Sequence, residues 1–130
     1  MITRGVYSAT CSILHDDYSL NVDATIAHAA STIENGLHGA IFFGSTGQSQ
    51  LISTSEKKDL IAKIANHKLR KYFFLGTGCN SLKETVDLIK YSYEYNFKDF
   101  LIMPPAYYKG NTDEGCLLYT SDAADDLVGV

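Results

Sequence analysis

The stretch Ala40-Ile41-Phe42-Phe43-Gly44-Ser45-Thr46-Gly47-Gln48 decides the fold, because an apolar run ends in a turn of glycines and hydroxyl side chains. A continuous apolar run is typical of a strand buried on both faces. Gly44 and Gly47 allow unusual backbone dihedral angles and a close approach to a ligand. The N–H and O–H donors of the turn suit a carboxylate or a phosphate. A turn with no ligand would have the same residues, so the rest of the chain must show whether this turn binds an anion.

Three more apolar runs resemble this strand. We expect strands at residues 6–12, 40–43, 72–75 and 100–103, the last one ended by Pro104-Pro105. Helical patterns separate them, so the predicted order is β-α-β-α-β-α-β. Continuously apolar strands joined by helical crossovers indicate a parallel sheet.

The helices are predicted from their apolar periodicity and from their ends. The first begins near Asp23 and ends at Asn35-Gly36. The second and third begin with capping boxes, at residues 53–56 and 81–84. The expected buried faces are Ile26, Ala30, Ile33 and Leu37 in the first helix, Leu60, Ile61, Ile64 and Ala65 in the second, and Leu82, Val86, Ile89 and Tyr93 in the third.

Two architectures fit this order: an open doubly wound sheet, or part of a (β/α)8 barrel. In both, ligands bind beyond the carboxyl ends of the strands. Polar residues that follow the predicted strands are Ser12, then Ser45 and Thr46, then Thr77 and Asn80, then Tyr107, Tyr108 and Lys109. We expect these side chains to form one concave site with hydroxyl donors and aromatic walls.

The composition argues against several functions. The chain has 130 residues, a net charge of −4 and scattered basic side chains, so nucleic acid is not an expected partner. No apolar run approaches the roughly 20 residues of a membrane-spanning helix, and no signal peptide is evident. The 3 cysteines lie far apart and are typical of reduced thiols in a cytoplasmic protein. The 4 histidines lack metal-ligand spacing, so no metal site is predicted.

Three turns together resemble those of a known family. The turns at residues 44–47, 76–80 and 104–108, in this order and spacing, resemble the dihydrodipicolinate synthase / N-acetylneuraminate lyase family. Members of that family are pyruvate-dependent class I aldolases on a (β/α)8 barrel. The resemblance covers residues 5 to about 115 and implies an incomplete TIM barrel, about the first four β/α units.

The resemblance also implies roles for single residues. Ser45 and Thr46 would hold the carboxylate of pyruvate, and Ser45 would also belong to a catalytic hydroxyl relay. Tyr107, or Tyr108 because the loop is one residue longer than in the synthases, would complete that relay in a neighbouring subunit. The implied partners are pyruvate, an aldehyde and further copies of the chain in a tetramer. No cofactor is implied.

The chain departs from the family pattern at several positions. Gln48 replaces a usual Glu, and Ile13 replaces a usual Pro after the first strand. Positions that bind feedback lysine in the synthases correspond to Ser49, Asn80 and Glu84. The histidines expected near them are Thr54 and Lys57 here, which weakens the case for lysine control.

The family's chemistry needs a lysine on strand six, which forms a Schiff base with pyruvate, and a tyrosine on strand five. Both would follow residue 115, so the chain is expected to lack its nucleophile and to be inactive alone. We expect Lys57, Lys63, Lys83 and Lys90 on solvated surface. Lys109 is nearest the expected site, but no motif supports it as a nucleophile.

The resemblance ends abruptly near residue 115. Residues 1–115 are expected to be the N-terminal half of the aldolase domain. Residues 116–130 resemble translated sequencing-adapter read-through, and a natural short acidic tail is the alternative. This tail, with three carboxylates at Asp122, Asp125 and Asp126, is expected to add nothing to the core.

The leading hypothesis is a fragment of a Schiff-base aldolase or synthase, a lyase of the 4-hydroxy-tetrahydrodipicolinate synthase or N-acetylneuraminate lyase type. A second hypothesis is a small flavodoxin-like domain that binds an anion at residues 44–47 without catalysis. Its weakness is the turn after the first strand, which is not glycine-rich. A third is a non-catalytic interaction fragment. The aldehyde partner stays open.

Overall fold

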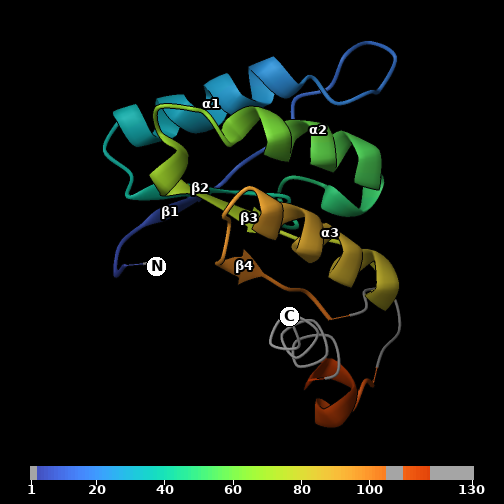
Figure 1. The fold of residues 1–130 in the computed structure, drawn as a ribbon. Helices are drawn as coiled ribbons and strands as arrows, with labels where there is room; N and C mark the ends of the chain where they lie inside the picture. The colour runs from blue at the N-terminus through green and yellow to red at the C-terminus, as the bar shows by residue number, and fades with distance from the viewer. Residues whose placement is uncertain (1–2, 105–109, 118–130) are drawn as a thin grey trace.

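The structure is a computed structural model that describes residues 3–104 and 110–117 (Figure 1). Its elements alternate between strands and helices along the chain, as the sequence predicts. They are β1 (Tyr7–Ala9), α1 (Val22–Glu34), β2 (Gly39–Phe42), η1 (Ser49–Leu51), α2 (Thr54–Ile64), η2 (Arg70–Tyr72), β3 (Phe73–Gly76), α3 (Leu82–Glu94) and β4 (Phe100–Leu101).

The four strands form one parallel sheet in the order β1-β2-β3-β4. The three α-helices lie on the same side of this sheet (Figure 1). A doubly wound sheet would place strands out of chain order and helices on both faces. Sequential order with helices on one side is the arrangement of a (β/α)8 barrel, so the structure decides between the two predicted architectures.

The strands are shorter than the apolar runs suggest. The first strand was expected from residue 6 to residue 12, but only Tyr7–Ala9 pairs with β2. Val6 is 62% exposed, because it lies outside the paired segment. The last strand is reduced to Phe100–Leu101, which pairs with the end of β3. Among the described residues, β1 and β4 are therefore the open edges of the sheet.

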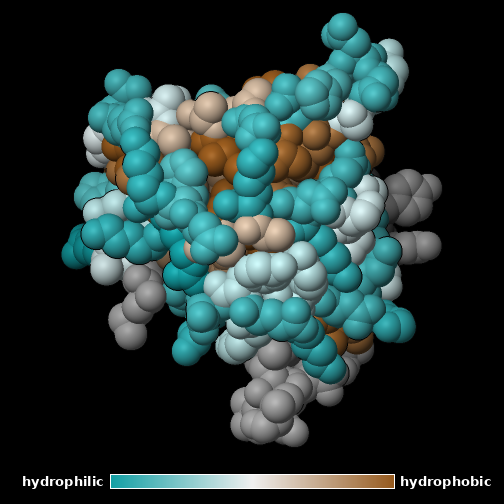
Figure 2. Space-filling model, turned by 45° about the horizontal axis from the view of Figure 1, so that its top comes forward, coloured by the Kyte–Doolittle hydropathy of each residue, from teal (hydrophilic) through white to brown (hydrophobic). Residues whose placement is uncertain are grey.

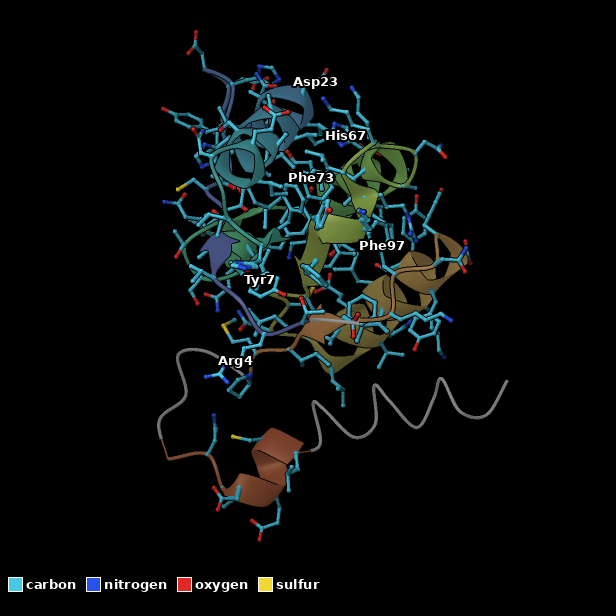
Figure 3. The ribbon with its side chains drawn as sticks, turned by 90° about the vertical axis from the view of Figure 1, so that its left-hand side faces the viewer. Arg4, Tyr7, Asp23, His67, Phe73 and Phe97 are labelled. Carbon is cyan, nitrogen blue, oxygen red and sulfur yellow. The ribbon has the colours of Figure 1, made fainter. Side chains whose placement is uncertain are left out.

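The core lies between the sheet and the helices. Leu60, Ile61 and Ile64 of α2 are fully buried, as expected from their spacing. On the helical side, apolar atoms show between hydrophilic side chains (Figure 2). Phe73, at the start of β3, packs its ring 5.2 Å from those of Phe42 and His67 (Figure 3).

The predicted buried face of α3 is confirmed for Ile89, which is 1% exposed, whereas Leu82 and Val86 are only half-buried and Tyr93 is exposed. Tyr93 is 37% exposed, whereas Thr85 and Ser92 are 1% exposed. Their hydroxyls donate to backbone carbonyls one turn earlier in the helix, at 3.0 Å to Ser81 O and 2.7 Å to Leu88 O. A hydroxyl satisfied within its own helix is buried at little cost. The spacing of apolar residues alone therefore does not predict which face of α3 packs against the core.

The beginning of α2 has the capping box that the sequence predicts. Ser53 accepts from the Glu56 N–H, and the Glu56 carboxylate accepts from the Ser53 N–H at 3.0 Å. The same carboxylate accepts from the Leu20 N–H at 2.7 Å, and so ties the preceding loop to this helix. For α3, the structure has Ser81 accepting from the Glu84 N–H.

Replacing Glu56 by Gln leaves one acceptor oxygen for the N–H groups of Ser53 and Leu20, which now use two, and should lower the free energy of unfolding by about 1 kcal/mol, the usual scale of a lost cap. Hydrogen bonds from Ser53 and Leu20 hold the pKa of Glu56 below its usual range. A carboxyl group with a lowered folded-state pKa stabilises the fold above its unfolded pKa, and this contribution is lost as pH falls through the folded pKa. Urea unfolding of both proteins between pH 3 and pH 7 is the measurement. Equal stability of the two at neutral pH would contradict the prediction.

The described part of the C-terminal region, residues 110–117, lies apart from α1 and α2 in two views (Figures 1 and 3). Within it, the Cys116 N–H donates to Thr112 O at 3.0 Å. The predicted tail falls mostly outside the described residues. Within residues 3–104 and 110–117, no helix is long and apolar enough to cross a membrane.

Candidate active site

The turn at residues 43–48 leaves the carboxyl end of β2 in a strained conformation. Phe43 has a φ of 60° and Gln48 a φ of 51°, both in the left-handed region. The Gln48 N–H donates to Ser45 O at 3.0 Å and closes the turn. A bulky aromatic residue rarely adopts this region, and such strain is common at functional sites. We expected the glycines to take the unusual dihedrals, but these two neighbours take them instead.

Gly47 is needed for space rather than for its φ. A Cβ atom at this position would lie 2.8 Å from the backbone oxygen of Thr10. Ser12 donates from Oγ to the Gly47 oxygen at 2.6 Å. The segment that follows β1 therefore packs against the turn, and the hydrogen bond from Ser12 fixes the position of Gly47. The sequence places Ser12 near the site but does not indicate this contact.

The hydroxyl side chains of Ser45 and Thr46 are exposed beyond the sheet. Ser45 Oγ lies 3.9 Å from Met103 Sδ, which comes from the chain after β4. Two hollows meet at Ser45, one of about 410 Å³ and one of about 220 Å³. The structure thus brings together the ends of β1, β2 and β4, as the sequence predicts for a site at this edge.

Three hydroxyls at the same edge lack hydrogen-bond partners within the described part of the chain. They belong to Thr10, Ser49 and Thr77, and each of these residues is 1% exposed. A buried hydroxyl without a partner costs about 1–3 kcal/mol. This end of the sheet is therefore not arranged for stability alone. Thr77 was expected to face the site, but it is buried within the fold.

Other predicted site residues lie elsewhere. Asn80 is exposed and borders a separate cavity beside α2. Tyr107, Tyr108 and Lys109 lie outside the described residues. The described residues contain no group of three or more His, Cys, Asp or Glu side chains that could hold a metal ion.

Lys57 is not on solvated surface, so that prediction is wrong. It is 2% exposed, and its Nζ donates to Thr77 O at 3.0 Å and to Gly78 O at 3.4 Å. Burial lowers the pKa of its ammonium group. Its position three, four and seven residues before Leu60, Ile61 and Ile64 is the signal that places it on the buried face of α2. In contrast, Lys63, Lys83 and Lys90 are exposed as expected.

Cys79 lies buried beside Lys57. It is 5% exposed, and burial raises the pKa of its thiol. Its Sγ lies 3.7 Å from Lys57 Nζ and donates to Thr77 O at 3.2 Å. Sequence spacing could not pair these residues, because 22 positions separate them along the chain.

The fold and the site define a β/α-barrel protein with an anion-suited turn at the carboxyl edge of its sheet. The family model described as Dihydrodipicolinate synthetase family matches residues 2–126. The chain belongs to this family.

Among its relatives, an uncharacterized DapA-like lyase of Chloroflexus aurantiacus is 31% identical over 125 residues, which are 95% of this chain and 42% of that protein. A probable mitochondrial 4-hydroxy-2-oxoglutarate aldolase of Emericella nidulans is 28% identical, over 90% of this chain and 40% of that protein. Dihydrodipicolinate synthase from Agrobacterium tumefaciens shares the fold with a TM-score of 0.84 and 23% identity, over 96% of this chain and 44% of that chain. The chain thus spans less than half the length of the relatives that it matches.

Proposed function

We propose that the turn at residues 44–48 binds the carboxylate of pyruvate, and that the chain is the N-terminal part of a Schiff-base aldolase or synthase. The observation that carries this proposal is the strained Phe43, which only Gly44 separates from the exposed hydroxyls of Ser45 and Thr46. Strain at a buried aromatic residue is retained where it positions functional groups. Family membership supports a pyruvate-dependent lyase as the class of enzyme.

Each residue of the turn has a distinct task in this proposal. Thr46 donates a hydrogen bond to the carboxylate, which is stronger than a bond between neutral groups. Ser45 donates to the same carboxylate and passes a proton through its hydroxyl. Tyr107, or Tyr108, completes that relay, since a phenol with a pKa near 10 transfers a proton without carrying charge at rest.

In this proposal, a longer form of the chain would supply the remaining parts of the enzyme. A lysine that follows these 130 residues would form the Schiff base, and the chain alone would therefore be inactive. The relay tyrosine would act in a neighbouring subunit, so the full-length form would be a homo-oligomer such as a tetramer. Dihydrodipicolinate synthesis is the first candidate reaction, ahead of sialic-acid cleavage and sugar-acid aldol cleavage.

Replacing Thr46 by Val should weaken pyruvate binding at least tenfold. The change removes one charge-assisted hydrogen bond, worth roughly 1.5–3 kcal/mol, and tenfold corresponds to about 1.4 kcal/mol. Titrating pyruvate into the isotope-labelled 130-residue chain, with amide chemical shifts as the readout, measures the affinity. Wild-type shifts should concentrate at residues 44–48.

The matched control is Thr32→Val, because Thr32 lies on α1 and its hydroxyl donates to Ala29 O within that helix. This variant should bind pyruvate as the wild type does. An unchanged affinity in Thr46→Val would remove Thr46 from the site, and an equal loss in both variants would show that the effect is not local.

A further inference from the structure

The buried pair Lys57 and Cys79 has no role in the proposed binding of pyruvate. Lys57 projects from the first turn of α2, and Cys79 follows β3. The amine nitrogen and the thiol sulfur lie 3.7 Å apart. Both side chains are at most 5% exposed, so the surrounding fold restricts their relative position.

The surroundings of the pair favour a reactive amine. Backbone oxygens of Thr77 and Gly78 surround Lys57 Nζ, and no carboxylate in the described part of the chain lies within ion-pair distance of it. Burial lowers the pKa of Lys57, although the nearby Cys79 and Glu84 act in the opposite direction, and a lowered pKa increases the share of the neutral, nucleophilic amine. Burial raises the pKa of the Cys79 thiol, so the thiolate that reacts with oxidants forms only when a base takes its proton, and the Lys57 amine 3.7 Å away is placed to do so.

A small oxidant can reach the sulfur. A cavity of about 490 Å³ adjoins the pair, and both Lys57 and Cys79 line it. Its other walls include the exposed residues Ser53, Ser55 and Asn80, so it opens to solvent. Hydrogen peroxide is small and polar, and it fits a cavity whose walls carry hydroxyl and amide groups.

We propose that Lys57 and Cys79 form a site of oxidative modification, in which a hydroperoxide converts them into a covalent sulfur–nitrogen cross-link. The Cys79 thiolate attacks one oxygen of hydrogen peroxide, the O–O bond breaks, and the released hydroxide takes a proton to become water. The Lys57 amine then attacks the sulfur of this sulfenic acid, the S–O bond breaks, and the hydroxide leaves as water with a proton from nitrogen. In sum, one thiol, one amine and one hydrogen peroxide give one S–N bond and two waters.

The cross-link would reach the turn at residues 44–48. It withdraws the ammonium donor from the carbonyls of Thr77 and Gly78. Gly78 lies so close to Ser49 that an added Cβ would meet Ser49 Oγ at 1.8 Å. We expect a shift of this backbone to be passed to Ser49, which directly follows Gln48. Reduction by a thiol would reverse the change.

The test uses the chain with Cys11→Ser and Cys116→Ser, because Cys11 is exposed and Cys116 is partly exposed. This background excludes disulfides within the chain. After treatment with hydrogen peroxide, the intact mass should fall by two hydrogens and return on reduction with dithiothreitol. Tryptic digestion should give a linked pair of peptides that contain Lys57 and Cys79, with cleavage after Lys57 lost.

Lys57→Arg in the same background is the matched control, since it keeps a cation but lacks a nucleophilic amine. It should retain a sulfenic acid that dimedone labels. Two results would overturn the proposal. The first is that oxidised Lys57→Arg loses the mass of two hydrogens to the same extent as the parent. That loss would indicate that a backbone nitrogen, and not Lys57, attacks the Cys79 sulfur. The other is a peptide map of the oxidised parent without the linked pair, which does not depend on how the variant folds.

Discussion

Gly76→Ala is expected to lower the free energy of unfolding by about 3 kcal/mol, the upper range for overpacking in a dense core. Gly76 ends β3 beside the strained Phe43. A Cβ at position 76 would lie 2.5 Å from Phe43 O and 2.8 Å from Phe43 C. These are backbone atoms, so no side-chain rotation relieves the contact. The backbone of β2 must move, and the turn at residues 44–48 must move with it.

Gly44→Ala is the matched control on the same turn. Its nearest neighbour would be Leu101 Cδ2 at 3.9 Å, an ordinary contact. Its stability should therefore stay within about 0.5 kcal/mol of the wild type. Urea unfolding followed by circular dichroism measures both variants. If Gly76→Ala unfolds at the same urea concentration as Gly44→Ala, then the backbone contact between β3 and Phe43 does not constrain the fold.

Lys57→Met is expected to cost about 2 kcal/mol of stability. Methionine fills similar space but leaves the Gly78 carbonyl without its ammonium donor and the Thr77 carbonyl with only the weak thiol donor of Cys79. A buried unsatisfied group costs about 1–3 kcal/mol, and relief of the buried ammonium's desolvation offsets part of this loss. The loop after β3 should therefore loosen first.

Lys63→Met provides the comparison on the same helix. Lys63 pairs with Asp23 at 2.5 Å, but its side chain is 51% exposed. Exposed ion pairs contribute about 0–1 kcal/mol, so this variant should resemble the wild type. Equilibrium unfolding gives the stabilities, and amide hydrogen exchange of residues 76–80 reports on the loop. A Lys57→Met protein as stable as Lys63→Met would show that the two carbonyls find other partners.

The order of elements could be predicted from the sequence, because it depends on neighbouring residues. Apolar runs at residues 40–43 and 72–75 mark strands wherever they lie in space. The capping box of Ser53 and Glu56 forms within one turn of helix, so its residues alone determine it. The same holds for the turn at residues 44–48, whose position after a buried strand indicated the edge at which a site can form.

The arrangement of the buried residues at that edge of the sheet depended on contacts between residues far apart in the chain. Lys57 was misplaced because a charged side chain is normally solvated, and only the loop after β3 supplies the carbonyls that bury it. The strain at Phe43 could not be read from its neighbours in the sequence, and the Gly76 backbone that packs against it comes from another strand.

The order of strands and helices was thus determined by the sequence itself, through local periodicity and end signals. The tertiary structure decided which polar groups are buried and which backbone is strained, because desolvation and close packing depend on what each side chain meets across the fold. Those contacts place a reactive lysine and cysteine side by side beneath the proposed carboxylate site.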